Sequence, residues 1–332
     1  MLTSLRLYSC ARKIWVLPNS FMGGSCPCLQ DLHLDGIPFL GLGKLLLSTS
    51  DLIDLCLEEI PHSGYIAPEA MIIYLSGLTK LQSFELGFRS LQSWAKQASR
   101  HPPTMTHIVL SALTRFWFQG DSMYLEEIMS QIDTPLLETF TITLFDSLVL
   151  NTPQLCHFIS HTKTFTALHQ ADIICHGVYS DISVTFFLLD GPGSTNRRVL
   201  MLGVQYTPSG PRFTSLVWLC SSSLPPLPTL ECLSTQHYLS SCPPCISVTE
   251  WVELLCVFSF VKDLRLSRKL SYSVFPALRE LAGEGVIEVL PALQNIFVHS
   301  TIWASDYFMK DIELFITTRQ LSGHPVAIHC LE

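Results

Sequence analysis

Two cysteines, Cys242 and Cys245, have the spacing that most directly suggests chemistry, because a C-x-x-C pair can ligate zinc or carry out thiol–disulfide exchange. A zinc site of the usual kind needs a second such pair. Cys26 and Cys28 are far away in the sequence and only one residue separates them. A redox pair begins a helix after a strand, whereas Cys242 and Cys245 lie in a segment rich in serine and proline. We interpret the pair as loop cysteines.

The other patterns that could bind a cofactor or catalyse a reaction are incomplete. Gly191 and Gly193 are followed by Asn196, where a dinucleotide-binding loop has its third glycine, and then by a strand-like run instead of a helix. His157 and His161 are four residues apart on an expected helix without a nearby carboxylate, which is typical of a helix surface. The sequence contains no G-x-S-x-G, P-loop or H-E-x-x-H motif. We therefore predict no enzyme, no cofactor and no metal site.

The composition indicates a large buried core. Charged residues make up 14% of the chain, against about 25% in an average soluble domain, and hydrophobic residues make up 48%. The net charge of −8, without a basic cluster, argues against a nucleic-acid partner. The apolar runs are shorter than the ~18 residues of a membrane-spanning helix, and the N-terminus does not resemble a secretory signal. We expect an intracellular protein, cytoplasmic or nuclear, without a membrane partner.

The elements that must position any site are predicted by a recurring pattern, L-x-x-L-x-L, in which three apolar residues alternate with others. Its middle residue recurs at intervals of 23 to 32 residues over most of the chain. Such a period is typical of leucine-rich repeats, whose units of about 20 to 29 residues contain a strand and a return segment. A single unit cannot bury its apolar face, so units stack. We expect the middle residues to be buried on adjacent parallel strands: Leu5, Leu32, Leu55, Phe84, Phe116, Phe140, Leu264 and Ile296, with weaker copies at Phe165-Leu168-Ala171 and Leu230-Leu233.

The segments between these strands have helical signals. Pro68 and Pro153 suit a first helical turn, and Ser247 with Glu250 forms the sequence of a capping box. Further apolar faces with helical spacing follow Tyr124 and residue 305, the last ending near Gly323. The predicted fold class is therefore α/β, an irregular leucine-rich-repeat solenoid with parallel strands on its concave face and helices on its convex face.

We expect residues 1–332 to form a single solenoid with one irregular region. Residues 172–228 fit the repeat poorly, because two strand-like runs, at 182–189 and 199–206, are separated by Gly191-Pro192-Gly193. This region is either a hairpin insertion or two atypical repeats. The chain begins inside a repeat, at Leu2, so we expect its first strand to have an open edge and the isolated protein to aggregate.

In such a solenoid the outward strand positions would form a protein-binding face. They begin with an acidic strip, Asp31, Asp35, Asp54 and Glu58, with His33 and Cys56 beside it. We centre the site on Trp117, because exposed aromatic residues are favoured at interfaces, although a cover of neighbouring segments or a register slipped by one residue would bury it. The predicted protein-binding residues are Asp31, His33, Asp54, Glu58, Glu85, Arg115, Trp117, Thr141, Arg265 and Phe297.

Several strings in the sequence resemble a known family. They are PNSFMGG at 18–24, LQDLHLDGIP at 29–38, IPHSGY at 60–65 with PEA at 68–70, LPALQNIF at 290–297 and RQLSGHPV at 319–326. Together these strings are similar to the repeat region of fungal F-box/leucine-rich-repeat proteins, and the resemblance covers nearly the whole chain.

The resemblance implies a protein-interaction module that holds the substrate of a ubiquitin ligase on its concave face. In such proteins an N-terminal F-box docks the ligase adaptor, and no F-box is present in this sequence, so an adaptor is expected as a partner only if an F-box lies upstream. The alternative is a free-standing repeat scaffold, or a truncated remnant, with no role in ubiquitination. An in-frame F-box upstream of Met1 would favour the first interpretation.

Overall fold

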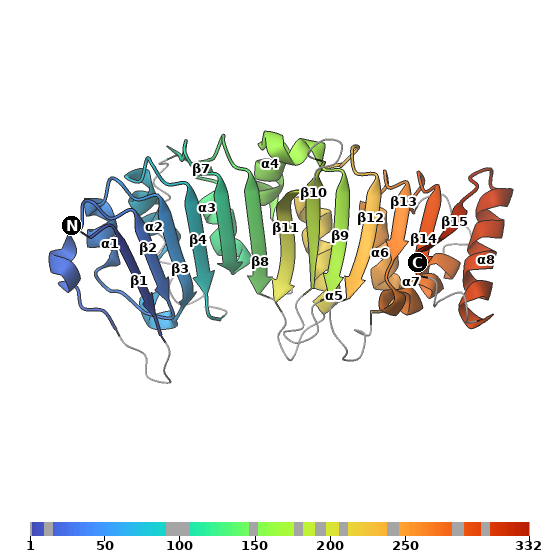
Figure 1. The fold of residues 1–332 in the computed structure, drawn as a ribbon, viewed down its shortest axis with the longest axis horizontal. Helices are drawn as coiled ribbons and strands as arrows, with labels where there is room; N and C mark the ends of the chain where they lie inside the picture. The colour runs from blue at the N-terminus through green and yellow to red at the C-terminus, as the bar shows by residue number, and fades with distance from the viewer. Residues whose placement is uncertain are drawn as a thin grey trace. The chain divides into compact units, whose positions relative to one another are not determined.

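The computed structural model describes two compact units of the chain (Figure 1). The described residues are 2–9, 16–90, 107–145, 152–175, 182–189, 197–205, 212–237, 246–280, 289–299 and 306–331. Unit 1 comprises Met1–Ser147 and Asn151–Lys163, and unit 2 comprises Leu148–Leu150 and Thr164–Glu332. Both are α/β and mostly parallel in their sheets, as the repeat pattern predicts.

Unit 1 contains six parallel strands that neighbour one another in chain order. The predicted middle residues pair across them in register, from Leu5 to Leu32, Leu55, Phe84, Phe116 and Phe140. β5 and β7 form a second, short parallel pair. In the chain β5 comes shortly before β6, and β7 comes shortly before β8. The strands are β1 (Ser4–Tyr8), β2 (Asp31–Asp35), β3 (Asp54–Ile60), β4 (Ser83–Phe88), β5 (Ile108–Val109), β6 (Arg115–Gly120), β7 (Ile132–Asp133) and β8 (Thr139–Phe145).

The buried face of this sheet is a set of side-chain rows perpendicular to the strands. Phe84, Phe116 and Phe140 stack with ring centroids 5.1 and 5.2 Å apart and nearly parallel planes. All three are buried, as are Leu32 and Leu55, which confirms their prediction as core. Leu5 is only half-buried, so its predicted burial is wrong, because among the described strands β1 lies at the edge of this sheet and pairs with β2 alone.

A backbone hydrogen bond repeats at the start of successive strands. The residue just before a strand donates its backbone N–H to the carbonyl oxygen of the residue just before the adjacent, earlier strand. In unit 1 the N–O distances of these bonds are 2.7 to 2.9 Å. Gln30 donates to Thr3, Ile53 to Gln30 and Gln82 to Ile53, and in unit 2 Lys262 donates to Glu231 and Gln294 to Lys262. These bonds satisfy polar backbone groups at the point where the chain turns inward.

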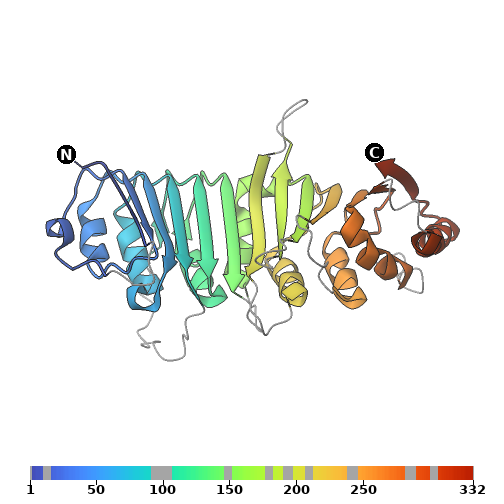
Figure 2. The ribbon, with the colours of Figure 1, turned by 60° about the horizontal axis from the view of Figure 1, so that its bottom comes forward.

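The helices of unit 1 cover one face of its sheet (Figure 2). They pack on one another in chain order: α1 (Leu42–Ser48), α2 (Pro68–Ser76), α3 (Ser122–Met129) and α4 (Pro153–His161). Pro68 and Pro153 occupy the first helical turns, as predicted. The Glu126 carboxylate of α3 accepts from the amides of Gln154 and Leu155, at 2.8 and 2.9 Å, and so satisfies donors that the first turn of α4 leaves free.

Unit 2 begins with an antiparallel meander, β9 (Gln170–Cys175), β10 (Ile182–Leu188) and β11 (Arg197–Gln205). The pairing of β10 with β11 confirms the hairpin interpretation of the irregular region. From β9 onward the sheet is parallel again, through β12 (Cys232–His237), β13 (Asp263–Leu266), β14 (Asn295–His299) and β15 (Ala327–Leu331).

In the weak repeat copy Phe165-Leu168-Ala171, the residue at the middle position of the row differs from the predicted Leu168. Ala171, and not Leu168, pairs in the row of Leu233 and Leu264. Ala171 also pairs with Phe186 of β10, which is fully buried. The repeat pattern therefore indicates the wrong residue for the middle position of this copy.

The helices of unit 2 pack in series: α5 (Arg212–Ser223), α6 (Val248–Val257), α7 (Arg268–Glu280) and α8 (Asp306–Leu321). The capping box of Ser247 and Glu250 is present, and Gly323 ends α8 with a φ of 80°. Arg319 of α8 is fully buried and donates to the carbonyls of Leu290 and Leu293, at 3.3 and 3.2 Å. This contact joins two strings on which the family resemblance rests.

We predict that Leu55→Ala lowers the free energy of unfolding by ~2 to 5 kcal/mol, because it removes a buried side chain from a close-packed row. Leu47→Ala on the outer side of α1, where Leu47 is 61% exposed, is the matched control and should change it little. Equilibrium denaturation in urea measures both. Equal losses for the two variants would contradict the burial of Leu55.

Candidate functional site

The candidate site is the face of the unit 1 sheet opposite its helices. In Figure 2 the helices α1 to α3 lie on one side of strands β1 to β8, and none of these three helices lies on the other face. A row of these side chains runs across the sheet in register, because each outward position pairs with the next. The row is Arg6, His33, Cys56, Glu85, Trp117 and Thr141.

Trp117 lies on this face, as the predicted register requires. Its side chain is half-buried, and its neighbours Phe116 and Phe118 are buried. The six-membered ring of the indole lies over Gly87 of β4, where a Cβ atom would come within 2.7 Å of Trp117 Cζ3. Gly87 therefore leaves room for the indole to rest over the neighbouring strand, and the register slip that would bury Trp117 in the core does not occur.

The acidic strip is partly neutralised by two arginines, one on the neighbouring strand and one on the next strand but one. Arg6 pairs with Asp31 at 2.5 Å, and Arg115 pairs with Asp54 at 3.2 Å. These are exposed ion pairs, so each contributes little to stability. They reduce the negative charge that we expected Asp31 and Asp54 to present to a basic partner.

The remaining negative charge on this face gathers where β3 meets β4. Glu58 and Glu85 lie within hydrogen-bonding reach of one another, and burial together with this contact raises the pKa of Glu58. Cys56 donates from Sγ to Glu85 Oε2 at 3.5 Å. Burial, followed by the nearby charge of Glu58 and Glu85, raises the pKa of the Cys56 thiol. The sequence places all three at outward positions, but no pattern in it predicts that they meet.

His33 completes this group from the other side. Its ring packs against Tyr8 of β1, with centroids 4.8 Å apart. The ligand atoms of His33, Cys56 and Glu58 all lie within 4.8 Å of one another. The strand register produces this proximity, since His33 pairs with Cys56 and Asp35 with Glu58.

The two predicted site residues of unit 2 form a separate cluster. The Arg265 guanidinium lies over the Phe297 ring, 5.5 Å from its centroid, and His329 stacks on the same ring at 4.8 Å. Phe297 is therefore half-buried between them. His329 was not among the predicted residues, although its strand position opposite Phe297 could have indicated it.

Thus the predicted residues divide between the two units. Eight lie on unit 1: Asp31, His33, Asp54, Glu58, Glu85, Arg115, Trp117 and Thr141. Of all ten, Arg115 and Arg265 are exposed and the others are half-buried.

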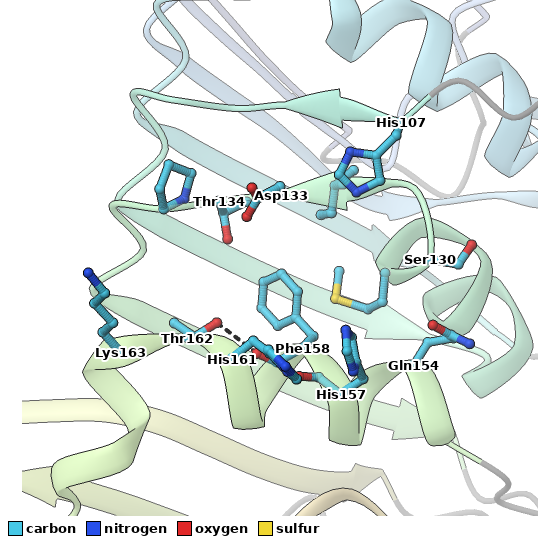
Figure 3. Close-up of a pocket in the computed structure, with 13 residues that line it drawn as sticks. His107, Ser130, Asp133, Thr134, Gln154, His157, Phe158, His161, Thr162 and Lys163 are labelled. Atoms are coloured by element: carbon cyan, nitrogen blue, oxygen red, sulfur yellow. Dashed lines mark hydrogen bonds between the residues drawn. The ribbon is translucent and has the colours of Figure 1, made fainter.

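A cavity of about 440 Å³ lies elsewhere in unit 1, beside α4 and the short strand β7 (Figure 3). Phe158 and Met129 contribute apolar surface, and the polar lining includes His107 and Lys163. His157 and His161 of α4 also line it; both are exposed, which confirms their prediction as helix-surface residues. Their rings are tilted by 36° with centroids 3.9 Å apart, and His161 Nδ1 lies 2.8 Å from the His157 carbonyl oxygen.

Two motifs considered from the sequence lie outside the described residues. These are the Cys242–Cys245 pair and the Gly191–Gly193 pair.

Comparison with known proteins does not assign the chain to a family. The sequence matches no protein-family model and no curated protein. Among the described helices, none combines the length and apolar character that crossing a bilayer requires.

We predict that Gly87→Ala is destabilising by about 1 to 3 kcal/mol, because the added methyl group overlaps the Trp117 indole. In a Trp117→Ala background the overlap is gone, and the same substitution should instead stabilise by roughly 0.5 to 1 kcal/mol, as alanine does over glycine within a strand. A double-mutant cycle of unfolding free energies measures the difference. The same sign in both backgrounds would show that the indole does not rest on Gly87.

Proposed function

We propose that the chain is a leucine-rich-repeat solenoid that binds another protein and does not catalyse a reaction. In this proposal it works inside the cell and holds the substrate of an F-box-type ubiquitin ligase. The observation that carries the binding proposal is the half-exposed indole of Trp117, which lies over Gly87 and is the fifth of the six residues in the outward row of unit 1. A large, preorganised aromatic surface of this kind is what interface hot spots offer a partner.

The surroundings of Trp117 suggest the chemistry of the partner segment. Glu85 pairs with Trp117 on one neighbouring strand and Thr141 on the other, so a carboxylate and a hydroxyl flank the indole. Because Asp31 and Asp54 already have arginine partners, Glu85 and Glu58 are the acidic groups best placed to meet a basic side chain. We therefore propose a segment with an apolar anchor for Trp117 and a lysine or arginine beside it.

The repeat pattern and the family resemblance support the ligase part of this proposal. The in-register rows of β1 to β8 and of β9 with β12 to β15 are what stacked leucine-rich repeats would require. The second candidate is a free-standing scaffold with the same binding face and no ubiquitin ligase. The discriminating observation is the sequence upstream of Met1: an in-frame F-box, with co-purification of the ligase adaptor by the extended chain, supports the first candidate.

We predict that Trp117→Ala weakens partner binding at least tenfold and leaves the thermal midpoint nearly unchanged, because the outward indole contributes more to an interface than to the core. The partner is first recovered by affinity capture on the parent chain and then titrated against each variant. Trp218→Ala is the matched control, since Trp218 is 55% exposed but lies on α5. Loss of binding in both variants, or in neither, would move the site away from this face.

A further inference from the structure

Four side chains with metal-binding atoms meet on the outward face of unit 1. His33 comes from β2, Cys56 and Glu58 from β3, and Glu85 from β4. The ligand atoms of the first three lie within 4.8 Å of one another, and Cys56 Sγ lies 3.5 Å from Glu85 Oε2. In a tetrahedral zinc site, with bonds of about 2.0 to 2.3 Å, ligand atoms are about 3.3 to 3.8 Å apart. Metal binding would draw these three atoms closer together, and Glu85, which lies beside Cys56 but outside the mutual 4.8 Å spacing, would move in as the fourth ligand.

The backbone holds these side chains in place. Cys56 and Glu58 are two residues apart on one strand and point to the same side, while His33 and Glu85 pair with Cys56 from the two adjacent strands. The Tyr8 ring packs against His33 and limits its movement. The pairing of β3 with β4 is irregular between Leu57 and Ile60, where Glu59 has a φ of 50°. Residues from three neighbouring strands of one sheet thus converge without any loop having to close.

The charges around this group favour a cation. Glu58 and Glu85 are close together and half-buried, and within the described ranges neither forms an ion pair with a lysine or arginine. The two nearby arginines are engaged elsewhere, Arg6 with Asp31 and Arg115 with Asp54. Two adjacent carboxylates without such a partner repel one another, and a divalent ion between them would remove this repulsion.

We propose that this group is a binding site for a divalent transition-metal ion of the zinc class. The four ligands are His33, Cys56, Glu58 and Glu85. The mixture of sulfur, nitrogen and oxygen donors favours zinc and disfavours calcium and magnesium, which take oxygen ligands. On binding, the Cys56 thiol loses its proton to solvent and its sulfur coordinates as the thiolate. Glu58 and Glu85 also belong to the proposed partner surface, but metal binding needs no partner and is measured on the chain alone.

Cobalt(II) is the probe for this site, because a cobalt–thiolate bond has a near-ultraviolet charge-transfer band that oxygen and nitrogen ligands alone do not produce. The full chain is used with Cys242→Ser and Cys245→Ser, so that the C-x-x-C pair cannot bind the ion. We expect one equivalent of cobalt to produce this band together with visible bands of tetrahedral intensity, and zinc to abolish both. Absence of the charge-transfer band would overturn the proposal.

Matched variants assign the band to its ligands. Cys56→Ser should remove it, whereas Cys330→Ser, at another strand cysteine that is exposed, should leave it unchanged. His33→Ala should weaken zinc binding at least tenfold in a calorimetric titration, whereas His62→Ala, at an exposed histidine of the same unit, should not. A band that persists in Cys56→Ser, or equal effects of the two histidine variants, would overturn the assignment.

Folding of the variants is checked by a cooperative thermal transition without metal. Zinc should raise the thermal midpoint of the Cys242→Ser, Cys245→Ser chain, because an ion that binds only the folded state stabilises it. If Cys56→Ser or His33→Ala does not fold, Glu85→Gln supplies the test, since it keeps the shape of the side chain and removes its charge. An undiminished zinc affinity in Glu85→Gln would exclude that carboxylate as a ligand.

Discussion

Backbone hydrogen bonding between successive turns of the chain is the constraint on which the rest of this structure depends. A strand of five or six residues with one apolar face is not stable alone, and it becomes stable only when its amides and carbonyls pair with those of the next strand. The repeated bond before each strand, such as Ile53 to Gln30 and Lys262 to Glu231, sets the register of that pairing. The outward residues of each strand therefore lie beside the outward residues of the adjacent strand, and the inward residues lie beside the inward ones.

The in-register arrangement has different consequences on the two faces of the unit 1 sheet. On the inner face it produces continuous rows, including the stacked rings of Phe84, Phe116 and Phe140, which the helices cover. On the outer face the same register brings unlike residues together. Trp117 can lie along the sheet because the residue beneath its ring is Gly87. A side chain at that position would lift the indole away from the strands and change the surface that a partner meets.

On the outer face, strand pairing decides which acidic side chains have an arginine within reach. Two acidic residues, Asp31 and Asp54, receive arginines from neighbouring or next-but-one strands. Glu58 and Glu85 receive no such partner among the described residues, and burial raises the pKa of Glu58. The apolar anchor and the acidic pair are thus adjacent features of one surface, and the proposals of partner binding and of ion binding share Glu58 and Glu85.

By itself the sequence determined the rows of buried residues in unit 1 and the helix starts at Pro68, Pro153 and Ser247, and it offered the hairpin of β10 and β11 as one of two alternatives. These are local signals, since apolar periodicity and capping chemistry act within a few residues. The half-burial of Leu5 and the shifted copy at Ala171 could not be predicted in this way, because both depend on which strand lies alongside. Only the tertiary structure decided the contacts of the outer face. Asp54 and Arg115 are 61 residues apart in sequence, and His33, Cys56 and Glu85 belong to three separate turns. No local pattern specifies these contacts between distant residues. They depend on the lengths of all the segments that connect one strand to the next and so bring the strands into register.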